Sequence, residues 1–143
     1  MKKLLFTLAC LLITLTAFAQ DGHGKFSPEK FQAELEEYII KEAKLTQQDC
    51  TKFMPMFREM TQKQRAIYER QRQLRHARPT DEAGYKDAIK KSDQMDIELK
   101  TLQQTYHEKF MTVLPASKVF EVIKAENRFH REMWKKWNHK KRK

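Results

Sequence analysis

Glycine and the signature motifs of enzymes are scarce in this 143-residue chain. It holds only three glycines, Gly22, Gly24 and Gly84, too few and too scattered to build a glycine-rich phosphate-binding loop. No G-x-S-x-G, H-E-x-x-H or C-x-x-C sequence occurs, so a nucleophile elbow, a zinc-protease site and a redox dithiol all lack candidate residues. We therefore expect no catalytic residues, no cofactor and no enzymatic activity.

Cysteine is also rare, with Cys10 near the N-terminus and Cys50 further along. Cys10 lies in an apolar run that we expect to be removed, so Cys50 remains alone and a disulfide framework within one chain is excluded. Cys50 falls beside a helical apolar stripe, where a small buried thiol is the interpretation we favour. An intermolecular disulfide through Cys50 is the alternative.

The chain has one long apolar run, Leu4 to Leu15. Two lysines precede it and an Ala-Phe-Ala sequence ends at Ala19, which is the pattern of a signal peptide, residues 1–19, cleaved after Ala19. The run is too short to span a bilayer, and no later stretch is apolar enough to do so. A lipoprotein anchored through Cys10 is disfavoured, because Cys10 lies inside the run. We predict an exported, periplasmic protein without an integral membrane segment in its mature form.

Acidic residues are outnumbered by basic ones. Removal of the signal peptide lowers the count of Lys and Arg from 29 to 27 against 19 Asp and Glu, so the mature chain carries about +8. Export argues against nucleic acid as the partner, which leaves acidic proteins and anionic envelope surfaces. A mature chain of about 124 residues has the size of a single domain.

Strand patterns are absent, and apolar residues recur instead at a three-then-four spacing that lines one face of an α-helix. Over 47–76 this stripe comprises Cys50, Phe53, Phe57, Met60, Gln64, Ile67, Gln71 and Leu74. Over 81–113 it comprises Tyr85, Ala88, Ser92, Met95, Leu99, Leu102, Tyr106, Phe110 and Val113. The short break around Pro79 predicts an antiparallel helical hairpin whose arms are roughly 45–50 Å long.

Two shorter helices are expected beside this hairpin. A serine N-cap at Ser27, followed by proline and glutamate, predicts a helix that runs to about Lys44. Thr46, with Asp49 three residues later, predicts a capping box at the start of the first arm. Pro115 separates the second arm from a last helix of about 116–138.

The predicted fold class is all-α, with four helices built on the long hairpin. We divide the mature chain into a flexible lead-in of 20–26, a helical domain of 27–138 and a basic tail of 139–143 that is solvated or disordered.

The last helix carries a wider apolar arc than contact with one neighbour requires. Its members are Val119, Val122, Ile123, Phe129, Met133, Trp134 and Trp137. This surplus, and a hairpin too long for the two shorter helices to cover, favour a homodimer. The two tryptophans and the basic tail could contact anionic lipid. We favour packing of both tryptophans against the hairpin, because they share a helix side with Ile123.

No metal site is predicted. The mature histidines, at 23, 76, 107, 130 and 139, do not pair with one another or with Cys50 at helical spacing. Only His130 and Glu126, four residues apart, could direct two ligands at one ion. A surface hydrogen bond between them is the interpretation we favour.

A basic face without acids follows the first hairpin arm, about 90° around the helix from the apolar stripe. It comprises Met54, Arg58, Thr61, Arg65, Tyr68, Arg72 and Arg75. Guanidinium groups pair with carboxylates, and methionine adapts to irregular partners. We expect Met54, Arg58, Arg65, Tyr68, Arg72 and Arg75 to bind partly unfolded acidic or amphipathic chains; a merely solvated basic face is the alternative.

The chain resembles the Spy/CpxP-like periplasmic proteins, whose hallmark is an L-T-x-x-Q motif that occurs twice. The first joint reads Leu45-Thr46-Gln47-Gln48-Asp49, with aspartate in place of the final glutamine. The second joint reads Leu114-Pro115-Ala116-Ser117-Lys118 and keeps only the leucine. The resemblance covers about residues 27–137 and marks Leu45, Thr46 and Leu114 as the family-motif joints.

This resemblance implies a cradle-shaped antiparallel homodimer that binds clients on its concave surface without ATP. Relatives hold unfolded proteins, damp an envelope-stress sensor kinase, or bind metal. We therefore expect an ATP-independent periplasmic chaperone, or holdase, whose partners are unfolded or partly folded envelope proteins. A regulatory adaptor for the periplasmic domain of an envelope-stress sensor is the alternative, and a metal-responsive protein comes third.

Overall fold

The structure, a computed structural model, describes residues 27–141. The predicted signal peptide, the lead-in of 20–26 and the last two residues lie outside this range. The described part forms four helices and no strand: α1 (Pro28–Glu42), α2 (Gln47–His76), α3 (Glu82–Met111) and α4 (Ala116–Lys141). The all-α prediction is confirmed.

Side chains cap the helix starts where the sequence predicts caps. The Ser27 hydroxyl accepts a hydrogen bond from the backbone N–H of Lys30. Thr46 and Asp49 form the reciprocal capping box, with bonds of 3.1 and 2.9 Å. Each cap satisfies backbone N–H groups that lack a partner inside the helix. At the C-terminal end α4 runs to Lys141, beyond the predicted end at 138, because no proline or glycine interrupts it there.

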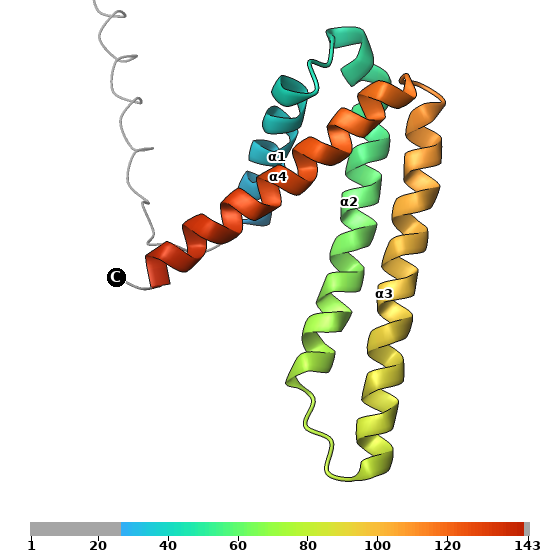
Figure 1. Cartoon of the computed structure of the whole chain (residues 1–143), viewed down its shortest axis with the longest axis vertical. Coiled ribbons are helices and arrows are strands. Elements are labelled where there is room, and N and C mark those ends of the chain that lie inside the picture. Colours follow the sequence, from blue (N-terminus) through green and yellow to red (C-terminus); the bar gives the residue numbers. More distant parts are fainter. Residues whose placement is uncertain (1–26, 142–143) are drawn as a thin grey trace, which may run out of the picture.

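The helices α2 and α3 lie side by side and antiparallel, while α1 and α4 pack together across the half of the hairpin that is far from its loop (Figure 1). The core lies where all four helices meet. Its largest fully buried side chains are Phe53, Phe57, Met60, Tyr106, Phe110, Leu35, Ile39 and Val122. Cys50 is half-buried and packs against this core.

The hairpin's predicted apolar stripes are buried only in part. On α2 the stripe residues Phe53, Phe57, Met60, Gln64 and Ile67 are buried. On α3 Tyr85 and Ser92 near the loop are exposed, contrary to the stripe prediction. The reason is that α1 and α4 do not reach the loop end, so two helices there have no third neighbour (Figure 1). A two-helix layer cannot bury a full stripe on each helix.

A candidate binding groove between α2 and α4

The predicted basic face of α2 divides into a covered part and an open part. Met54 is only 5% exposed and belongs to the core, so its assignment to a binding surface is wrong. It lies where α1 and α4 cover α2, and an apolar thioether is stabilised by that burial. Arg58, Arg65, Arg72 and Arg75 are exposed, and Tyr68 is 48% exposed.

Two of the arginines form ion pairs with acids that the sequence pattern did not associate with this face. The Arg58 guanidinium donates to both carboxylate oxygens of Glu36 on α1, at 2.6 to 3.1 Å, and lowers the pKa of that carboxyl. Arg72 pairs with Glu69 at 2.9 Å. Helical spacing alone could not show Glu36, because it comes from another helix and meets α2 only in the folded chain.

The other two arginines are less engaged. The Arg65 guanidinium lies 3.4 Å from the backbone carbonyl of Pro28, at the start of α1. Arg75 has no hydrogen bond or ion pair with any residue in the described range 27–141. Its five N–H donors are therefore available to an anion outside the chain.

The open part of the face forms one wall of a groove of about 990 Å³, and α4 forms the opposite wall. The α2 wall comprises Arg65, Tyr68, Glu69, Arg72 and Arg75; the α4 wall comprises His130, Met133, Trp134, Lys136, Trp137 and His139; Phe31 of α1 lies between them. Two surfaces that the sequence suggested separately, the arginine face and the aromatic-basic end, thus become one site.

Trp134 and Trp137 do not pack against the hairpin as we predicted. They are 65% and 54% exposed and line the groove. The cause is the course of α4, which lies near α2 at its start and diverges from it toward its C-terminal end (Figure 1). Because the gap widens, side chains from the two helices do not close over each other, and a large apolar surface stays open to solvent.

A buried carboxyl lies next to two residues that line the groove, His130 and Tyr68. The side chain of Glu126 on α4 is 14% exposed, and burial raises its pKa to about 7. It lies 3.9 Å from Nε2 of His130, whose own pKa is lowered by burial. Burial and the nearby Glu126 both raise the pKa of Tyr68. Desolvation disfavours the charged form of each of these groups.

The predicted joints lie next to each other. Leu45 and Leu114 are buried at 8% and 3% exposure, and Thr46 caps α2. Lys118, at the start of α4, donates to Asp49 at 2.5 Å and so ties the second joint to the first. This contact and the capping box lower the pKa of Asp49 to about 2. The joints therefore hold α4 in place above the hairpin.

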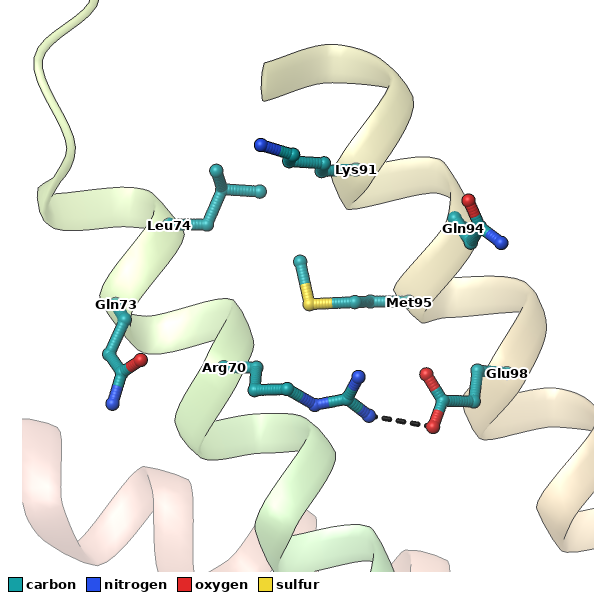
Figure 2. Close-up of a pocket in the computed structure, with 7 residues that line it drawn as sticks. All are labelled: Arg70, Gln73, Leu74, Lys91, Gln94, Met95 and Glu98. Atoms are coloured by element: carbon teal, nitrogen blue, oxygen red, sulfur yellow. Dashed lines mark hydrogen bonds and ion pairs between the residues drawn. The ribbon is translucent and has the colours of Figure 1, made fainter. Parts of the chain in front are cut away.

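A second, smaller hollow of about 450 Å³ lies between α2 and α3 near the hairpin loop. Figure 2 shows Leu74 and Met95 directed toward each other across it, and an ion pair of 2.6 Å between Arg70 and Glu98. Lys91 extends over the same space. The hollow lies where α2 and α3 bury few side chains between them, so we interpret it as incomplete packing rather than as a binding site.

No group of three or more His, Cys, Asp or Glu side chains in the described range could hold a metal ion. Among the same residues, no helix is both long and apolar enough to cross a membrane. No protein-family model, no curated protein and no solved structure matches this chain.

Proposed function

We propose that this protein is an ATP-independent periplasmic holdase that binds unfolded or partly folded envelope proteins. One observation carries the proposal: the groove between α2 and α4 presents arginines, Tyr68 and two half-exposed tryptophans in one open surface. Exposed apolar surface of this extent marks a site of interaction with other molecules. The resemblance to the Spy/CpxP-like proteins supports the same conclusion.

The chemistry of this surface suits weak, unselective binding. Arginine heads attract acidic segments from a distance, while their stems and the aromatic rings contact apolar side chains. The two walls consist largely of arginine, aromatic and thioether side chains, which adapt to partners of different shape. Clients of many sequences can therefore bind, and none binds tightly.

We further propose that the functional unit is a homodimer. Several large apolar side chains on α3 and α4 are exposed in the single chain, namely Tyr85, Ile89, Ile97, Met111 and Phe120. A second copy that covered some of them would supply the third layer that the hairpin lacks near its loop. The two grooves of such a dimer would form one larger client surface.

The proposal is tested by light scattering from a chemically unfolded, unrelated protein diluted into buffer without ATP. We expect purified 20–143 to suppress aggregation near one dimer per client, and to do so for several unrelated clients. Unchanged scattering at a several-fold excess would reject the holdase. The alternative, an adaptor for one envelope sensor domain, would then be pursued by pull-down from the envelope fraction.

A further inference from the structure

The groove between α2 and α4 also has the composition of a small-molecule site. Its volume, about 990 Å³, lies at the upper end of the roughly 300–1,000 Å³ range of ligand pockets. Aromatic and thioether side chains line its interior, contributed by Phe31, Tyr68, Met133, Trp134 and Trp137. Such a wall favours a hydrocarbon group, because burial of apolar surface is the main source of binding free energy there.

Cations also line this groove. Four lining residues are always positively charged at neutral pH, namely Arg65, Arg72, Arg75 and Lys136, against the single carboxylate of Glu69. Glu69 offsets Arg72 only in part, since their contact uses one of the guanidinium nitrogens. Arg75, without a partner among residues 27–141, is the best placed to receive an anion.

The helical walls leave an extended peptide deep in the groove without backbone partners, so client chains would contact its open rim through their side chains. The groove's lining residues belong to the helices α1, α2 and α4, whose backbone N–H and C=O groups bond within the helices. An extended peptide in the groove would bury its own amides without backbone partners, at a considerable cost in free energy. A hydrocarbon chain has no such groups and incurs no such cost.

We propose that this groove binds one molecule of a single-chain anionic amphiphile, a fatty-acid carboxylate, with its head at Arg72 and Arg75 and its chain along Tyr68, Trp134 and Trp137. This inference goes beyond holdase activity and does not depend on it. The head lies at Arg72 and Arg75 because Arg65, the third arginine of the groove, is engaged with the backbone carbonyl of Pro28 at the start of α1.

The test uses the chain's own fluorescence, because its two tryptophans both line the groove. Purified 20–143 is titrated with dodecanoate carrying a terminal bromine, below its micelle concentration, and quenching is followed. We expect saturation at one molecule per chain. Shortening the chain by two methylenes should weaken binding several-fold, since each buried methylene contributes to affinity. Dodecanol, which lacks the charge, should bind roughly tenfold more weakly.

A matched pair of variants separates the groove from general surface charge. Arg75→Gln should weaken dodecanoate binding roughly tenfold, because it removes the charge-assisted contact to the head. Arg131→Gln removes the same charge from an exposed site on α4 outside the groove and should leave binding unchanged. Circular dichroism checks that both variants keep their helices.

Several results would overturn the proposal. Equal binding of dodecanol and dodecanoate, or equal effects of the two variants, would remove the cationic head site. Quenching only at micelle concentrations, or by anionic phospholipid vesicles but not by monomers, would indicate contact with a lipid surface instead. Quenching by an acidic amphipathic peptide alone would make the groove a protein site. The peptide result would support client binding in this groove, and the other results leave aggregation suppression untouched, so the two proposals can fail separately.

Discussion

Glu126 shows how burial changes the chemistry of one side chain. Its carboxyl lies between α4 and the face of α2 that carries Tyr68, with its side chain 14% exposed. His130 lies 3.9 Å away, but it can form an ion pair only when protonated. Burial lowers the pKa of His130, which disfavours its protonated form, and burial raises the pKa of Glu126 to about 7. Ionisation of Glu126 in the folded protein therefore produces a carboxylate with little compensation for its lost hydration.

This predicts a specific dependence of stability on pH. Burial raises the pKa of Glu126 from 4.5 to about 7, so between these values the folded state binds more protons than the unfolded state. Its contribution to stability is fully present below about pH 4.5 and is lost as the pH rises toward 7. Glu126→Gln should abolish that loss and raise the free energy of unfolding near pH 8 by about 2–3 kcal/mol.

Urea denaturation at several pH values measures this effect. Glu34→Gln, which changes an exposed carboxyl on α1, is the control and should follow the wild-type profile. If the free energy of unfolding of Glu126→Gln fell with rising pH as much as that of the wild type, the carboxyl would not be buried as described.

At the scale of the helix, the start of α2 depends on one short cluster of side chains. Thr46 and Asp49 satisfy each other's backbone N–H groups, and Lys118 from α4 joins the same carboxylate. Because these contacts hold the pKa of Asp49 near 2, the stability that they contribute is present above about pH 4 and is lost as the pH falls. The cluster therefore connects a local cap with the position of α4.

Removal of the cap tests its contribution. Thr46→Ala leaves the backbone N–H of Asp49 without its side-chain acceptor and should lower the free energy of unfolding by about 1 kcal/mol. Thr51→Ala removes a hydroxyl that bonds only to the backbone carbonyl of Gln47 within the same helix, and should be close to neutral. The midpoints of urea denaturation give both values. Equal losses in the two variants would mean that the capping box has no special role.

The hairpin as an element differs between its two ends. At the covered end Phe53 and Phe110 meet edge to face with ring centroids 4.8 Å apart, and the core contains all four helices. Between the loop and Met95 no side chain of α3 is buried. Polar contacts such as the ion pair of Arg70 with Glu98 join α2 to α3 in this region. Exposed ion pairs of this kind contribute little to stability, so the loop end depends on the covered end.

At the scale of the whole molecule, the groove exists because two helices that start close together diverge. Three exposed arginines of α2, Arg65, Arg72 and Arg75, line one wall of this groove. Arg72 is paired with Glu69, whereas Arg65 and Arg75 form no ion pair with a described residue, so the field of this wall is weaker than a count of arginines suggests.

Charge reversal tests whether this wall captures clients. Arg65→Glu with Arg72→Glu should weaken aggregation suppression several-fold, because acidic segments would be repelled. Lys86→Glu with Lys90→Glu changes the net charge equally on an exposed part of α3 and should have little effect. Client capture by the wild type should also fade as salt rises from about 0.1 to 1 M, where the Debye length drops from about 10 to 3 Å. Capture that survives both changes would exclude the arginine wall as the client site.

Much of the fold is local and could be predicted from the sequence. The caps at Ser27 and Thr46 act within three or four residues, and the three-then-four spacing of apolar side chains requires a helix wherever it occurs. The bounds of α2 and α3 therefore lie within two residues of the predicted 47–76 and 81–113. Arg65, Tyr68, Arg72 and Arg75 were predicted on an open face for the same reason, because spacing alone determines which side of a helix they occupy.

Only the tertiary structure decided what meets each face. Met54 has the same helical phase as the arginines, yet α1 and α4 cover it, and Glu36 reaches Arg58 from a distant point in the sequence. Trp134 and Trp137 have the spacing of core residues, but the divergence of α4 from α2 leaves them beside an open groove. Periodicity determines the side of a helix on which a residue lies, whereas the presence of a neighbour there depends on how whole helices cross.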